Sequence, residues 1–276
     1  MQVGIMARTF YRPTLSEMLD AIVSYDIYSV QFSFGCVGLP ELPEYIDLKL
    51  CDEIRDEMEK HKITISAMSG TCNMIDPDIN KRKDGLKRLS DLISVCDHLG
   101  ASVMSLCTGT RDPQNMWMRH PDNDTEEAFR DIVESLQEVL EVAEKHKVIL
   151  GFEPEVSNVI DSGVKGKRLI DELKSPFLKV VMDGANVFHK GELPKMKDIL
   201  DETFKFLGEH IIIAHAKDLD HDGDAGNLPA GKGLLDYDHY ISLLKRYKPD
   251  VPVILHGLSE QEAGECVSFL REKIGD

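Results

Sequence analysis

The chain alternates between short continuous apolar runs and longer segments in which apolar residues recur every three or four positions. Continuous apolar runs are typical of strands covered on both faces, and the longer spacing is typical of amphipathic helices. The runs predict strands at residues 3–7, 28–34, 63–68, 102–107, 148–152, 179–182, 211–214 and 251–255. The spacing predicts helices behind residue 14, over 48–60, 83–98, 125–146, 167–173, 196–207 and 237–246, and behind residue 259.

Several helix ends carry their own signals. Thr14 and Glu17 have the spacing of a capping box, and Ser259 and Glu262 repeat it before the last helix. Gly100 is a typical stop signal after a helix. These signals place the helices between the strands without overlap.

Strict alternation of eight strands with eight helices predicts an α/β fold with a parallel sheet, because each helix carries the chain back for the next strand. Eight such units close a (β/α)8 TIM barrel, and we expect one barrel domain over residues 1–276. A doubly wound open sheet is the alternative, but the chain lacks the usual nucleotide signature.

Charge, apolar runs and cysteines disfavour several classes of protein. The 276 residues carry 49 acidic and 32 basic side chains, a net charge of −17, which disfavours nucleic acid as a partner. No apolar run reaches the roughly 18 residues of a membrane span, and the N-terminus is interpreted as a first strand rather than a signal peptide. Six scattered cysteines without a Cys-x-x-Cys pair indicate free thiols, and hence a cytoplasmic protein.

Chemistry-bearing residues follow four successive predicted strands. Glu153, Asp183, His215 and His256 each come directly after an apolar run, so they are expected to meet at the catalytic end of the barrel. Oxygen and imidazole ligands suit one divalent ion, Mn²⁺, Mg²⁺, Co²⁺ or Zn²⁺. Glu155 is a rival for Glu153, although Pro154 favours Glu153 as the inward residue.

Five short motifs follow one another along the chain: Phe-Glu153-Pro, Met-Asp183-Gly-Ala-Asn186, His215-Ala-Lys217-Asp218, Gly231-Lys-Gly233 and Ile-Leu-His256-Gly. This ordered series resembles the xylose isomerase-like TIM barrel superfamily. That group includes sugar phosphate isomerases and epimerases, ketose 3-epimerases, inosose dehydratases and endonuclease IV. The resemblance implies metal binding by Glu153, Asp183 and His215, and contact of Asn186 with substrate hydroxyls. Many members carry a second Glu, both ligand and base, where this chain has His256.

Two long segments, residues 109–124 and 219–236, follow predicted strands and are expected on the catalytic face. In the first, Trp117 either stacks on a sugar or anchors the loop from a buried position, and Arg111 could meet phosphate or carboxylate. In the second, Lys232 is either the counter-charge of a phosphate or a solvent-exposed lysine.

Two further residues are candidates for binding substrate. Arg8 follows the first strand and is expected to face the barrel mouth. His189 lies one helical turn beyond Asn186 and either lines the cavity or caps a surface helix.

The leading hypothesis is a metal-dependent isomerase or epimerase acting on a sugar, keto-sugar or sugar phosphate through an enediolate. Glu153 would transfer the proton, with His256 or Lys217 on the other face; a nearby cation would lower the pKa of the lysine. The alternatives are a dehydratase or lyase on a cyclic polyol or keto-acid, a DNA-hydrolysing multi-metal enzyme, and a non-catalytic carbohydrate-binding barrel. A homo-oligomer is also compatible with this size.

Overall fold

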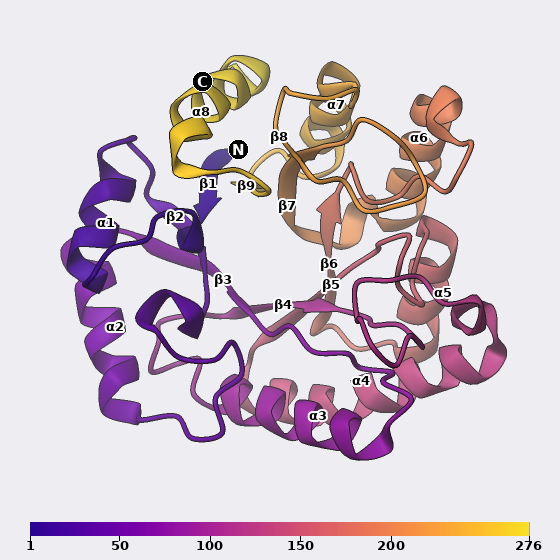
Figure 1. The fold of residues 1–276 in the computed structure, drawn as a ribbon, viewed down its shortest axis with the longest axis horizontal. Coiled ribbons are helices and arrows are strands. Elements are labelled where there is room, and N and C mark those ends of the chain that lie inside the picture. Colours follow the sequence, from indigo (N-terminus) through magenta and orange to yellow (C-terminus); the bar gives the residue numbers. More distant parts are fainter. Residues whose placement is uncertain (276) are drawn as a thin grey trace.

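The strands pair in chain order, and the last returns to the first. In the computed structural model, which describes residues 1–275, the ring closes where Ile5 of the first strand lies opposite Leu255 of the last. Eight parallel strands within these residues form the barrel, and eight helices surround it (Figure 1). The predicted (β/α)8 fold is therefore confirmed; Asp276, the final residue of the predicted domain, lies outside the described residues.

The barrel strands carry the apolar runs of the sequence, and all eight predicted strands are present. They are β1 (Gln2–Met6), β2 (Ser29–Phe32), β3 (Thr64–Ser69), β4 (Val103–Cys107), β5 (Ile149–Glu153), β6 (Leu178–Asp183), β7 (Ile211–Asp218) and β9 (Pro252–Leu255). A short strand β8 (Leu228–Pro229) pairs antiparallel with the end of β7.

The helices bury their apolar stripes against the outside of the ring. The two predicted capping boxes, at Thr14 and Ser259, are both formed. The helices are α1 (Leu15–Val23), α2 (Leu48–Lys60), α3 (Ile79–Ser94), α4 (Glu126–His146), α5 (Gly163–Leu173), α6 (Met196–Leu207), α7 (Tyr237–Tyr247) and α8 (Glu260–Ile274). Short 3-10 turns lie at Ala7–Thr9, Phe34–Val37, Pro121–Asp124, Leu193–Lys195 and Gly208–His210.

The prediction of residues 83–98 as a helix was wrong at both ends. Helix α3 begins at Ile79 because the Asp78 carboxylate accepts the backbone N–H of Asn80 at 2.9 Å. It ends at Ser94, and residues 95–100 form turns that still bury apolar side chains. The apolar spacing continued through those turns, which is why it did not mark the helix end.

Helix α5 starts four residues before its predicted start at residue 167. A Cβ atom on Gly163 would lie 2.8 Å from the Thr203 Cα atom, so this glycine lets α5 approach α6 closely. Glycine is a poor helix former, and Gly163 and Gly166 concealed the first turns from the sequence pattern. Ser162 caps the helix by accepting the N–H of Lys165.

Strand β7 is longer than the predicted run of residues 211–214. It continues to Asp218 because Lys217 and Asp218 pair with β8 across the loop that follows. His215 and Lys217 therefore lie within a strand rather than after one. Both side chains gain fixed directions from this extension.

The apolar core has two parts. The larger lies between the strands and the helices, and the smaller fills the inside of the barrel. The inner part consists of Met6, Ala67, Val103, Val181, Ile213 and Ile254. No helix within residues 1–275 is long and apolar enough to cross a membrane, and the six cysteines are free thiols, as predicted.

Candidate active site

A cavity of about 310 Å³ opens at the end of the barrel where the strands terminate. Its floor stands on the inner apolar cluster, and its walls come from strand ends and loops. The residues that line it include Arg8, Gln31, Glu41, Ser69, Trp117, Glu153, Glu155, Asn186, His215, Lys217 and His256.

Strand alternation aims three of the predicted side chains inward. Val181 and Ile213 point into the barrel, so Asp183 and His215, two residues further along, point the same way. Asp183 and His215 are also direct neighbours in the pairing of β6 with β7. Glu153 stands at the end of β5, the next strand in the ring.

These three residues meet at the cavity floor. The Nδ1 atom of His215 lies 3.4 Å from Glu153 Oε2 and 4.0 Å from Asp183 Oδ2. Asp183 is completely buried, and His215 is 2% exposed. Such burial of ionisable groups is costly unless each has a compensating partner.

The floor contains polar atoms without a hydrogen-bond partner. Asp183 Oδ2, His215 Nδ1 and His256 Nδ1 are all buried and form no hydrogen bond. One potential ligand atom from each of these three residues lies within 4.8 Å of the other two. Unpaired buried oxygen and imidazole nitrogen atoms at this separation fit a divalent cation, with Glu153 beside them.

Lys217 supplies a positive charge next to this cluster. Its Nζ atom lies 3.4 Å from Asp183 Oδ2, and its side chain is 8% exposed. Burial by itself would lower the pKa of Lys217, but the carboxylates of Asp183, Glu153 and Glu155 outweigh burial and raise it. The sequence led us to expect that a nearby cation would lower this pKa; the carboxylates around the lysine have the opposite effect.

The two glutamates at the end of β5 have opposite pKa shifts. Burial would raise the pKa of Glu153, yet the neighbouring His215 and Lys217 outweigh burial and lower it to about 2. Burial and the charge of Glu153 together raise the pKa of Glu155 to about 7. Both carboxyl groups line the cavity, so Glu155 is present in addition to Glu153 rather than in its place.

His256 follows β9 and completes the floor. Its ring lies 5.2 Å from the ring of His215, nearly edge-on, and its Nε2 atom lies 3.1 Å from Nη2 of Arg8. Burial, and then the charges of Lys217 and His215, lower the pKa of His256 well below its usual value. The imidazole is therefore neutral at physiological pH.

Asn186 contacts Glu153 directly. Its Nδ2 atom donates to Glu153 Oε1 at 2.7 Å, and its Oδ1 atom accepts the backbone N–H of Gly226 at 3.0 Å. The resemblance implied contact with substrate hydroxyls. In the structure the amide also fixes the orientation of the Glu153 carboxylate, and Asn186 lines the cavity with a second N–H left for a further partner.

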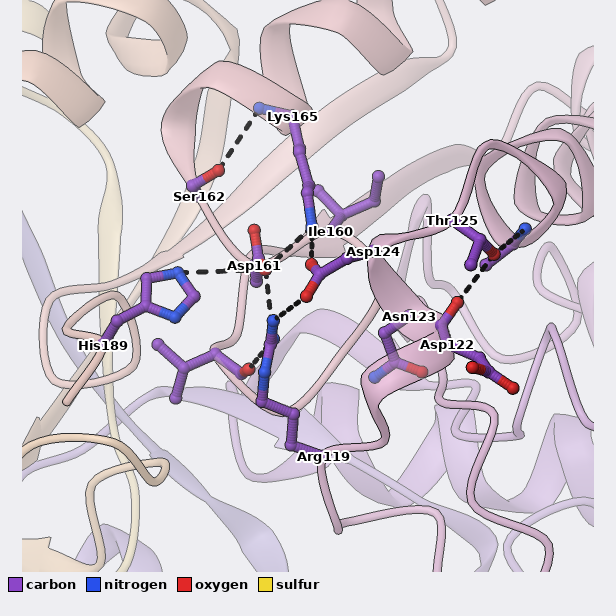
Figure 2. A network of polar contacts seen from close by, with 12 residues as sticks. Arg119, Asp122, Asn123, Asp124, Thr125, Ile160, Asp161, Ser162, Lys165 and His189 are labelled. Carbon is purple, nitrogen blue, oxygen red and sulfur yellow. Dashed lines mark hydrogen bonds and ion pairs between the residues drawn. The ribbon is translucent and has the colours of Figure 1, made fainter.

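Trp117 forms part of the cavity wall and is 52% exposed, so it is not a buried anchor. Its loop is held by Arg119, which donates to the Val156 carbonyl at 2.8 Å and to Asp161 at 3.1 Å (Figure 2). The Asp161 side chain is only 4% exposed and also accepts from Lys165 at 2.8 Å. This network joins the loop after β4 to the loop after β5.

The structure does not bring three predicted substrate-binding residues to the cavity. Arg111 pairs with Asp131 of α4 at 2.6 Å and lines a separate hollow. His189 faces Asp161 at 3.8 Å, within the network of Figure 2. Lys232 is turned outward and pairs with Glu265 of α8.

The orientation of Lys232 has a local cause. The Asp218 carboxylate already accepts the backbone N–H groups of Gly231, Leu219 and Leu235. A Cβ atom on Gly233 would lie 2.3 Å from the Leu219 carbonyl, so this glycine allows the loop to wrap around Asp218. The loop therefore encloses a carboxylate of the protein, not an external phosphate.

Sequence reasoning missed several polar residues of the cavity, among them Gln31 and Glu41. The amide oxygen of Gln31 lies 2.9 Å from His215 Nε2, and Glu41 accepts from Ser33 at 3.2 Å. Gln31 is a polar residue within the apolar run of residues 28–34, and such an interruption was a usable signal. Glu41 lies in an irregular loop, where no periodicity marks its direction.

A model of the xylose isomerase-like TIM barrel family matches residues 19–273, nearly the whole chain. The chain belongs to this family. Among curated proteins, no sequence matches this xylose isomerase-like barrel.

Solved structures resemble the xylose isomerase-like barrel in fold at low sequence identity. The 3-keto-D-glucoside 4-epimerase YcjR from E. coli, in its apo form, has a TM-score of 0.76 at 14% identity and covers 99% of both chains. The IOLI protein with a bound zinc atom has a TM-score of 0.76 at 17% identity, covering 100% of this chain and 98% of its own. The probable 3-DHS dehydratase AsbF from Bacillus anthracis has a TM-score of 0.74 at 12% identity, covering 100% and 99%.

Proposed function

We propose that this chain is a metal-dependent isomerase or epimerase that acts on a small sugar or keto-sugar through an enediolate. The observation that carries the proposal is the pair of buried atoms, Asp183 Oδ2 and His215 Nδ1, that form no hydrogen bond at the floor of a cavity that Glu153 and Lys217 also line. An epimerase of a keto-glucoside shares the fold, which agrees with this class of reaction.

Glu153, Asp183 and His215 are the residues that would hold the ion, as Mn²⁺, Mg²⁺, Co²⁺ or Zn²⁺. When bound, a divalent ion acts as a Lewis acid that polarises a carbonyl and stabilises the negative charge formed on proton removal. A structure of the same fold contains a zinc atom, which supports this assignment. His215 is oriented for the role by Gln31, 2.9 Å from its other ring nitrogen.

The other roles in the reaction would fall to Glu153, Lys217 and His256. Glu153, whose carboxylate is held by Asn186, would take the proton from the carbon next to the carbonyl. The ammonium of Lys217 would stabilise the negative charge that develops on the substrate oxygen. His256 would act on the opposite side of the substrate, at the end of β9.

The cavity favours an uncharged substrate over a phosphorylated one. Glu41, Glu153 and Glu155 face it, against the cations Arg8 and Lys217. Arg111 and Lys232, the other candidates for phosphate, are paired with acidic side chains elsewhere. The exposed indole of Trp117 offers an apolar surface to the face of a sugar ring.

The test uses metal-depleted protein reconstituted with Mn²⁺, Mg²⁺, Co²⁺ or Zn²⁺ and incubated with unphosphorylated ketoses and keto-glycosides in heavy water. We expect deuterium to enter recovered substrate next to the carbonyl, together with an isomeric product. The Asp183→Asn variant should lose the ion and the exchange, whereas the control Asp250→Asn, an exposed residue before β9, should keep both. No exchange with any ion would overturn the proposal.

The same experiment separates the related reactions. Loss of water to give an enone absorbance would assign the site to a dehydratase. Comparison of Glu153→Gln with Glu155→Gln identifies the proton acceptor. Exchange should disappear in Glu153→Gln and persist in Glu155→Gln.

A further inference from the structure

The two histidines at the cavity floor have opposite hydrogen-bond environments. Each ring has one nitrogen with a partner and one buried nitrogen, Nδ1, without any. The partner of His215 is a hydrogen-bond acceptor, and the partner of His256 is a hydrogen-bond donor. In a neutral imidazole one nitrogen carries the proton and the other a lone pair, so these partners determine which is which.

His215 is held in the tautomer that a metal ligand needs. The Gln31 amide donates from Nε2 to Ser69 Oγ at 3.0 Å, which directs its oxygen to His215 Nε2. This oxygen can only accept, so Nε2 of His215 carries a proton. The Nδ1 atom, which lies 3.4 Å from Glu153 Oε2 and 4.0 Å from Asp183 Oδ2, is the nitrogen left to bind an ion.

His256 is held in the other tautomer. Its Nε2 atom lies 3.1 Å from Nη2 of Arg8, and a guanidinium has five N–H donors and no acceptor. The Nε2 atom must therefore offer its lone pair, which leaves the proton of the neutral ring on Nδ1. An Nδ1–H group cannot coordinate a metal ion.

The backbone around His256 keeps the ring in this position. The His256 N–H donates to the Ala216 carbonyl at 3.1 Å, which extends the pairing of β9 with β7. Gly257 follows with a φ of +72°, in the left-handed region, and turns the chain away from the cavity. The contact with Arg8 thus joins the end of β1 to the end of β9 across a fixed backbone.

We propose that Arg8 fixes His256 as an Nδ1–H group, and that His256 is therefore not a ligand of the ion that Asp183 and His215 would hold. This inference rests on the proposed function for the presence of that ion. His256 lies in the same cluster of potential ligand atoms as Asp183 and His215, but a buried Nδ1–H group has no lone pair to offer an ion. Arg8 is then a positioning residue.

The first test is nitrogen NMR of protein labelled with ¹⁵N-histidine, metal-free and with Zn²⁺. We expect His256 protonated on Nδ1 and His215 on Nε2, with signals assigned by the His256→Gln and His215→Gln variants. Arg8→Lys retains a side chain that only donates and should preserve the His256 tautomer. Arg8→Met removes the donor, so the His256 ring should no longer be restricted to the Nδ1–H tautomer. A His256 ring protonated on Nε2 in the wild type would overturn the inference.

The second test measures Zn²⁺ affinity by competition with a chromophoric chelator. His256→Gln should weaken binding by less than about tenfold, whereas His215→Gln should weaken it by more than about 100-fold. Arg8→Met should bind Zn²⁺ more tightly than wild type, because a lone pair on Nδ1 becomes available. Equal losses in the two histidine variants would contradict the inference.

These readouts do not depend on turnover. If the NMR and Zn²⁺ results are as expected but no sugar reacts, the proposed function fails and the assignment of His256 stands. If sugars react but His256 proves to be a ligand, the reverse holds. Thermal unfolding of each variant checks that it is folded, and the Arg8 variants test the tautomer should His256→Gln not fold.

Discussion

Arg119 Nη1 lies 3.1 Å from Asp161 Oδ2, and this contact ties the loop that carries Trp117 to the loop after β5. Asp161 is nearly buried, whereas Arg119 and Lys165, which share its carboxylate, are about a third exposed. The loop that forms this wall of the cavity is therefore held by the Asp161 carboxylate rather than by apolar packing.

Substitution Asp161→Ala should lower the free energy of unfolding by about 1.5–3 kcal/mol, the usual value for hydrogen bonds to a charged group. The larger cost of a fully buried pair does not apply, because both cations can reach water once the carboxylate is gone. Urea denaturation measures the change. The exposed neighbour Asp122, changed to Asn, is the control and should differ from wild type by less than about 0.5 kcal/mol.

Trp117→Ala should raise KM for a sugar about tenfold and leave kcat within a factor of two or so, because the indole contacts substrate equally before and during the reaction. Trp117→Phe retains a ring and should lose less. Steady-state kinetics check this, with Met118→Ala as the control, since Met118 is exposed beside Trp117 but does not line the cavity. An unchanged KM in Trp117→Ala would remove this residue from the substrate site.

Gln31→Met should weaken Zn²⁺ binding by about 10–100-fold, because His215 loses the acceptor that fixes its Nε2 proton. Gln31→Glu keeps an acceptor at the same position and should bind Zn²⁺ at least as tightly as wild type. A chelator competition titration measures both. If Gln31→Met bound Zn²⁺ normally, the orientation of His215 would have to come from strand β7 alone.

Glu155 should make a contribution to the stability of the metal-free protein that falls with rising pH. Its pKa is raised from 4.5 to about 7 on folding, so between these values the folded state holds more protons than the unfolded state. The stabilising contribution is complete below about pH 4.5 and is lost as pH rises through 7, by about 3 kcal/mol in total.

Glu155→Gln should abolish that slope, so the variant gains stability relative to wild type as pH increases and the gain levels off above about pH 7. Urea denaturation at a series of pH values between 4.5 and 8, in the presence of a chelator, measures the difference. Glu138→Gln, an exposed substitution on α4, should parallel the wild type throughout. If the free energies of unfolding of wild type and Glu155→Gln changed in parallel with pH, the raised pKa of Glu155 would be contradicted.

Side-chain directions within the strands could be predicted from the sequence, because they follow the two-residue period of a strand. Alternation along β6 and β7 determined that Asp183 and His215 face inward, and the order of the strands determined that they are neighbours. The fold followed from the same regularity, because eight alternating units leave few other arrangements.

Loop residues could not be predicted in the same way. Arg111, His189 and Lys232 lie in segments without a period, where the direction of each side chain depends on a local partner: Asp131, Asp161 and Glu265 respectively. Those partners are distant in sequence, and nothing in the pattern associates them. The tautomers proposed for His215 and His256 likewise depend on Gln31 and Arg8, which are distant from them in sequence.

Asp183 and His215 belong to strands of a closed barrel, while Trp117 belongs to a loop attached only at its two ends. A strand cannot shift without breaking the backbone hydrogen bonds that close the barrel. A loop can be lengthened, shortened or exchanged without breaking them. The residues proposed for the chemistry are thus fixed by the barrel, whereas the residue proposed to contact the substrate is on a loop that can change without moving them.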